Sequence, residues 1–88
     1  MNLYSHSQSL EERVHSLVAW TFVVEESQIK DDTHLIKDLG ADSMDLIELV
    51  MTVNETFGIE LDTTHLERMM RVSGLVRVIR EAMPVQTS

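Results

Sequence analysis

One serine stands among acids in the stretch DLGADSMDLIELV, which runs from Asp38 to Val50. The glycine-bearing turn LGA leads into a helical pattern, so we expect the Ser43 hydroxyl at or just before the first helical turn. Two roles are open to it there. Serine commonly caps a helix, but a phosphate ester on this hydroxyl would also suit the free N–H groups at the positive helix end. Asp42 and Asp45 would partly oppose such an anion.

Catalysis by Ser43 alone is not favoured by its surroundings. A serine hydrolase needs a base within hydrogen-bond reach, a group that orients the base, and an oxyanion hole. The G-x-S-x-G elbow is missing, and the nearest preceding histidine, His34, is nine residues upstream. A small helical bundle also offers little room for a pocket that excludes water. We therefore predict that the chain is not an enzyme.

The helix expected over residues 43–57 has apolar residues on two sides. The inner stripe has the spacing of a core face and consists of Leu46, Leu49, Val50, Val53 and Phe57. The outer strip mixes apolar and acidic side chains and is predicted to bind partners: Met44, Asp45, Ile47, Glu48, Met51 and Glu55. Flexible methionines rimmed by acids suit a transient contact with a basic protein surface. The alternative is that a neighbouring element covers Met44 and Met51; Glu48, in the middle of the strip, favours exposure.

The other elements are also predicted to be helical. Apolar spacing predicts a helix over 9–24, starting at Ser9, with Trp20 and Phe22 as packing residues. A short helix capped by Thr63 or Thr64 runs through Met70, and a last helix, capped by Ser73, ends before Pro84. Residues 25–42 form a long loop held by four apolar residues, namely Ile29, Leu35, Ile36 and Leu39. The fold class is therefore all-α, a small four-helix bundle of three longer helices and one short helix.

Composition and charge limit the function classes. The 88 residues are 43% hydrophobic and include no cysteine, so we expect one globular domain over 1–88, with 1–8 and 84–88 as frayed tails. The formal net charge is −8, and the excess of acids lies before residue 61. This charge disfavours nucleic acid and anionic membranes and favours basic proteins. We expect a cytoplasmic monomer with no membrane span, because neither a secretion signal nor a long apolar run is present.

The histidines and acids do not predict a metal site. His6, His15, His34 and His65 contain no i, i+4 pair that would place two ligands on one helix face. The aspartates between residues 31 and 45 do not match the spacing of a calcium loop. We read the four histidines as surface or boundary residues.

The segments EERV, DLGADSMD and ELVM resemble an acyl carrier protein, and the likeness extends from about Leu10 to Ala82. The resemblance implies a four-helix bundle with 4′-phosphopantetheine attached to Ser43 by a phosphopantetheinyl transferase, Asp42 flanking the attachment turn. It also implies partners with basic docking patches: acyl-transferring, condensing or acyl-activating enzymes. The arm would carry acyl intermediates as thioesters in fatty acid, specialised lipid or polyketide biosynthesis.

Five residues depart from the pattern of the family. Arg68 and Arg71, with His65, lie in a helix that is often acidic in carriers of fatty acid synthesis. Asn54 replaces a common acid, and Val23 replaces a helix-ending glycine. These departures suggest a dedicated partner set. Two alternatives stay open: a peptidyl or aminoacyl carrier, and a carrier-like structural subunit that is never acylated.

Overall fold

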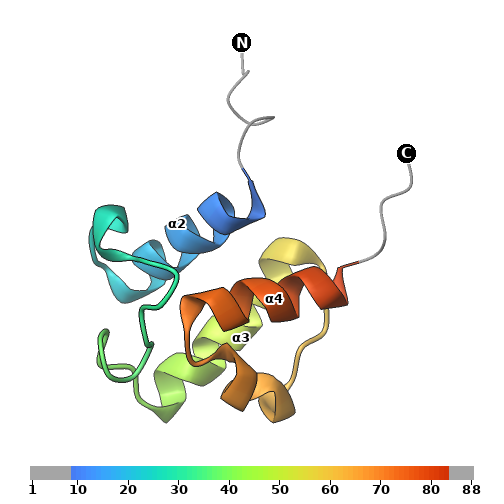
Figure 1. The fold of residues 1–88 in the computed structure, drawn as a ribbon. Helices are drawn as coiled ribbons and strands as arrows, with labels where there is room; N and C mark the ends of the chain where they lie inside the picture. Colours follow the sequence, from blue (N-terminus) through green and yellow to red (C-terminus); the bar gives the residue numbers. More distant parts are fainter. Residues whose placement is uncertain (1–8, 84–88) are drawn as a thin grey trace.

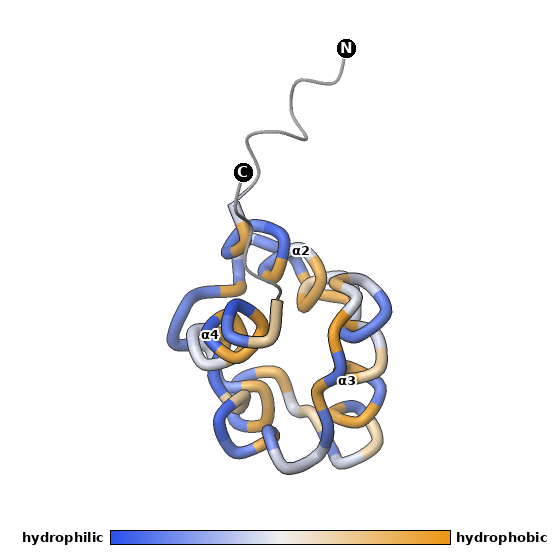
Figure 2. The backbone as a smooth tube through the Cα atoms, turned by 90° about the vertical axis from the view of Figure 1, so that its right-hand side faces the viewer, coloured by the Kyte–Doolittle hydropathy of each residue, from blue (hydrophilic) through white to orange (hydrophobic). Residues whose placement is uncertain are grey.

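The helices of the chain surround one hydrophobic core. The computed structural model describes residues 9–83, so the predictions for both tails and for His6 lie outside the described residues. The elements are α2 (Leu10–Phe22), the 3-10 helix η1 (Glu26–Gln28), α3 (Ser43–Phe57), the 3-10 helix η2 (Thr63–Met69) and α4 (Val72–Ala82) (Figure 1). Figure 2 shows α2, α3 and α4 around a common centre. The predicted all-α bundle is confirmed, with η1 as an additional turn in the long loop.

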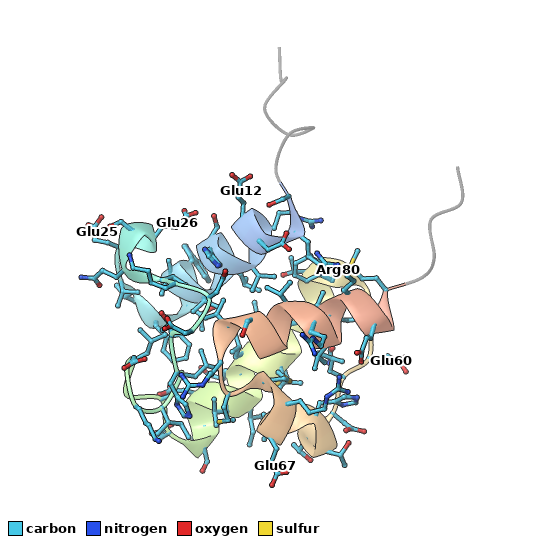
Figure 3. All side chains as sticks on the ribbon, viewed as in Figure 1. Glu12, Glu25, Glu26, Glu60, Glu67 and Arg80 are labelled. Carbon is cyan, nitrogen blue, oxygen red and sulfur yellow. The ribbon has the colours of Figure 1, made fainter. Side chains whose placement is uncertain are left out.

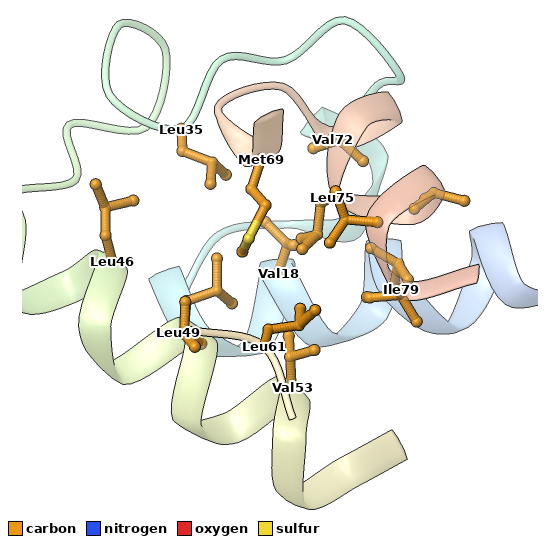
Figure 4. Close-up of a cluster of buried hydrophobic side chains, with 14 of the residues drawn as sticks. Val18, Leu35, Leu46, Leu49, Val53, Leu61, Met69, Val72, Leu75 and Ile79 are labelled. Atoms are coloured by element: carbon orange, nitrogen blue, oxygen red, sulfur yellow. The ribbon is translucent and has the colours of Figure 1, made fainter. Parts of the chain in front are cut away.

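Aliphatic side chains from every longer segment fill the core. The fully buried ones are Val14 and Val18 from α2, Leu35 from the loop, Leu49 and Val53 from α3, Met69 from η2, and Val72, Leu75, Val78 and Ile79 from α4. Many of them meet in the cluster drawn in Figure 4. Burying a side chain of this size contributes about 1.5–3 kcal/mol. Within residues 9–83, no helix combines the length and apolarity needed to cross a membrane.

The first helix is capped at its start and strained at its end. The Ser9 hydroxyl accepts the Glu12 N–H at 3.1 Å, and the Glu12 carboxylate accepts the Ser9 N–H, which completes a capping box. α2 ends at Phe22 because Val23 adopts the left-handed conformation, with φ 56°. The Val24 N–H then donates a hydrogen bond to the Ala19 carbonyl oxygen at 3.0 Å. This ending is a Schellman motif, in which glycine is the usual left-handed residue.

The left-handed backbone conformation of Val23 is strained, and burial of its side chain does not offset this strain because the side chain is exposed. A left-handed β-branched residue costs about 1–2 kcal/mol, whereas glycine adopts this conformation without strain. We predict that Val23→Gly stabilises the fold by about 0.5–1 kcal/mol, because relief of the backbone strain exceeds the opposing gain in unfolded-chain entropy, which is about 0.5–1 kcal/mol. Urea unfolding followed by circular dichroism measures the change.

The matched control for this substitution is Glu25→Gly, at an exposed residue of the same loop with extended backbone angles. Glycine relieves no strain there, so Glu25→Gly is expected to be neutral or destabilising. Equal stabilisation by both substitutions would contradict strain at Val23.

The long loop is attached to the junction of η2 and α4 by backbone hydrogen bonds. The Leu35 N–H donates to the Met70 carbonyl at 2.8 Å, and the Val72 N–H donates to the Thr33 carbonyl at 3.0 Å. His34 and Arg71 thereby form an isolated β-bridge. Ile29 and Leu35 are buried and Leu39 is half-buried, as predicted; Ile36 is exposed, so its prediction as a core contact was wrong.

Three details of the predicted elements were also wrong. Asp62, not Thr63 or Thr64, caps η2, and its side chain accepts the Thr64 N–H at 3.0 Å. Ser73 lies inside α4; its N–H donates to the Asp31 carbonyl, so loop carbonyls rather than a capping side chain satisfy the start of α4. Trp20 is 78% exposed instead of packed.

A close backbone approach joins η2 to α4. Gly74 lies against the end of η2, where an added Cβ would be 2.1 Å from the Arg68 carbonyl oxygen. Only glycine allows this approach without a backbone shift. Gly74 therefore determines how closely the two segments pack.

Candidate functional site

The N-terminus of α3 places the predicted serine in a specific position. Asp42 is the N-cap, and its Oδ1 accepts the Asp45 N–H at 2.9 Å. The Asp45 Oδ2 accepts the Asp42 N–H at 3.1 Å, so the two aspartates form a reciprocal capping box. Ser43 is the first helical residue and is exposed. The alternative in which Ser43 caps the helix was therefore wrong, because Asp42 has that role.

The same geometry leaves backbone donors next to the Ser43 hydroxyl. The N–H groups of Ser43 and Met44 belong to the first turn of α3 and have no acceptor within residues 9–83. Free N–H groups and the positive end of a 15-residue helix favour an anion at this position. The capping bonds between Asp42 and Asp45 satisfy one oxygen of each carboxylate. A phosphate ester on Ser43 therefore fits this turn.

The two faces of α3 are separated as the sequence predicts. Leu46, Leu49, Val50 and Val53 are buried. Phe57 is half-buried and packs against the core, and the Arg13 guanidinium carbon lies 4.6 Å from its ring centroid. This cation–π contact covers the outer edge of the core face.

The outer strip of α3 is open to solvent for most of its length. Met44 is 66% exposed, Ile47 42% and Met51 57%, and Glu48 and Glu55 are exposed. The alternative in which the two methionines are covered is therefore wrong within the described chain. Asp45 is half-buried, because its carboxylate closes the capping box. Exposed apolar side chains among acids make a surface that can take a basic partner with apolar contacts.

Asn54 has a structural role that its sequence context did not reveal. Its amide nitrogen donates to the Leu61 carbonyl at 2.9 Å, and its amide oxygen accepts the Leu61 N–H at 2.8 Å. Both bonds are partly buried and attach the segment after α3 to the helix. An aspartate has no amide donor and could not make both bonds. The absence of an acid at this position therefore has a folding explanation.

We predict that Asn54→Asp destabilises the protein by about 1–3 kcal/mol, because the Leu61 carbonyl loses its donor and faces a carboxylate. Chemical unfolding measures the loss. Glu55→Gln, on the exposed neighbouring residue, is the control and should change stability by less than about 0.5 kcal/mol. Unchanged stability of Asn54→Asp would show that the bidentate contact is not needed.

The three histidines within residues 9–83 each have a hydrogen-bond partner other than Ser43. The His34 Nδ1 accepts the Ile36 and Lys37 N–H groups at 3.2 and 3.1 Å. The Nδ1 lone pair of His34 is therefore used by these two backbone N–H groups. His15 and His65 lie beside Asp31 and Asp62, each at 3.2 Å. All three are half-buried boundary residues, as predicted.

Similarity to known proteins decides the family. A family model described as a phosphopantetheine attachment site matches residues 12–79. An acyl carrier protein of Thermotoga maritima is 39% identical over 69 residues, which cover 78% of this chain and 85% of the relative. The chain belongs to the acyl carrier protein family. Acyl carrier proteins bear a covalent 4′-phosphopantetheine arm, catalyse no reaction themselves, and interact with phosphopantetheinyl transferases and acyl-handling enzymes.

A solved acyl carrier structure has the same fold. The NMR structure of the HMG-ACPI domain from the CurA module of Lyngbya majuscula superposes with a TM-score of 0.72 at 28% sequence identity. The superposition covers 82% of this chain and 72% of that chain. The chain therefore agrees with the family in both sequence and fold.

Proposed function

We propose that Ser43 is the attachment point of the 4′-phosphopantetheine arm and that the chain carries acyl intermediates on it. The observation that supports this most directly is the division of roles at the start of α3. Asp42 caps the helix, which leaves the Ser43 hydroxyl exposed beside backbone N–H groups that have no acceptor among residues 9–83. When attached, the arm supplies a terminal thiol that holds the acyl group as a thioester.

The outer strip of α3 is proposed as the surface that partner enzymes recognise. Its residues are Met44, Asp45, Ile47, Glu48, Met51 and Glu55. The acids attract a basic patch, and the unbranched methionines adapt to more than one partner. Because the arm keeps the cargo near any docked enzyme, weak and short-lived contacts are sufficient.

The cargo is proposed to be an intermediate of fatty acid or specialised lipid or polyketide biosynthesis in the cytoplasm, carried by a monomer built as one domain. Arg68 and Arg71 support a partner set that differs from that of a general fatty acid carrier. If a cognate ligase loads an amino acid onto the arm, the peptidyl carrier alternative replaces this proposal.

The attachment is tested by intact-protein mass after incubation with coenzyme A, magnesium and a broad-specificity phosphopantetheinyl transferase. The parent chain is expected to gain one phosphopantetheinyl group, and Ser43→Ala is expected to gain none, because it lacks the hydroxyl that forms the ester. Ser27→Ala, at an exposed serine in η1, is the matched control and should be loaded like the parent.

Loading of Ser43→Ala would place the arm on another residue. Absence of loading on a folded parent chain would instead favour the structural subunit alternative. Full activity of Ser43→Ala in a complex with its partner would favour that alternative as well.

Reversal of one strip charge tests the docking surface. We predict that Glu48→Lys lowers kcat/KM for loading by about tenfold, equivalent to about 1.4 kcal/mol, because it places like charges together at a basic partner surface. Glu60→Lys makes the same charge change in the segment after α3, outside the strip, and should have a much smaller effect. Equal losses in both variants would indicate an effect of net charge alone.

A further inference from the structure

A basic cavity lies on a part of the molecule that the α3 strip does not include. Its volume is about 460 Å³, and its charged lining consists of Arg68, Arg71 and Arg77, with His34 and one acid, Glu67. Arg68 comes from η2, Arg77 from α4 and Arg71 from the two-residue connection between them, and His34 comes from the long loop. We call this cavity the arginine pocket.

Three of the seven lysines and arginines of the chain converge on this pocket, although the formal net charge is −8. The sequence indicated Arg68 and Arg71 as unusual but not Arg77. Arg77 lies on α4 and lines the same pocket as the other two arginines. Glu67, the one acid in the lining, extends outward from η2 toward solvent (Figure 3). The pocket is therefore a local positive region on an acidic protein.

The contacts around the pocket position Arg68 and Arg71 and use only part of their guanidinium donors within residues 9–83. An Arg71 guanidinium nitrogen donates to the Asp32 carbonyl at 2.8 Å, which positions the side chain but uses only one of its donors. Arg68 pairs with Glu81 at 2.8 Å, and both side chains are about half exposed. Arg77 is exposed and has no ion pair within residues 9–83. The backbone bonds between the loop and α4 keep the walls together.

This arrangement suits carboxylates, because a guanidinium fork matches the two oxygens of a carboxyl group. A small free anion would gain little, since each exposed guanidinium contributes only a weak, solvent-screened contact. A protein surface that presents several carboxylates can meet all three guanidinium groups at once, and its second and third contacts are intramolecular. Charge complementarity therefore favours an acidic protein as the occupant.

We propose that the arginine pocket is a second docking site of this acyl carrier protein, which receives aspartate and glutamate side chains of an acidic partner protein. The acidic α3 strip then selects basic partner surfaces, whereas the arginine pocket selects acidic ones. A partner that presents only basic groups to the pocket is rejected by like-charge repulsion.

The test is an NMR titration of the ¹⁵N-labelled apo chain with a hexaglutamate peptide at low salt, with inorganic phosphate as a second probe. Amide shifts are expected to concentrate at His34, Arg71, Ser73 and Gly74. Arg77→Gln should weaken peptide binding by about 2- to 5-fold, the range for an exposed ion pair. Glu67→Gln should strengthen binding, by about 2-fold, because it removes the opposing charge.

Arg80→Gln is the matched control, since Arg80 lies on the same helix outside the pocket and pairs with Glu11. It should bind the peptide like the parent chain, and circular dichroism should show the same helix content for all variants. Three results would overturn the proposal: shifts spread evenly over the surface, equal weakening by Arg77→Gln and Arg80→Gln, or tighter binding of phosphate than of hexaglutamate. The titration uses the unloaded chain, so its outcome is independent of whether Ser43 accepts the arm.

Discussion

The structure depends on the way Leu35 joins three parts of the chain. Its side chain is fully buried in the core, its N–H donates to Met70 at the end of η2, and its carbonyl accepts the Ala41 N–H at 3.0 Å. Ala41 is itself buried and directly precedes Asp42, the N-cap of α3. One loop residue therefore connects the core, the η2–α4 junction and the turn before Ser43. Without this connection the long loop would have little to define the direction in which α3 begins.

The residue that holds the helix start is not the residue proposed to bear the arm. A serine that capped α3 would commit its hydroxyl oxygen to a backbone N–H, and esterification would then compete with helix stability. Placing the cap on Asp42 removes this conflict, because the capping box keeps its bonds whatever is attached to the next residue. The acids of this turn repel a phosphate, and the need for an independent cap explains why they are there.

The sequence predicted α3 and its two faces well because their signal is local. The buried stripe of α3 and the exposure of Met44, Ile47 and Met51 follow from helical spacing. The end of α3 follows from the next residue, Gly58, which adopts the left-handed conformation with φ 67°. The N-cap residues were harder to predict, since Asp, Ser and Thr cap helices about equally well and are neighbours at residues 42–43 and 62–64. The choice depends on which residue has extended backbone angles, and Asp42 and Asp62 have them. The start of α4 could not be predicted, because carbonyls more than thirty residues away satisfy it.

The exposed position of Trp20 has a consequence for how this protein can be studied. It is the single tryptophan of the chain and is 78% exposed in the folded state. Its indole is therefore already close to its aqueous environment, and unfolding changes that environment little. A melt followed by intrinsic tryptophan fluorescence would have a small amplitude even if every helix were lost. The same side chain should instead be a sensitive optical reporter of any molecule that binds over the end of α2.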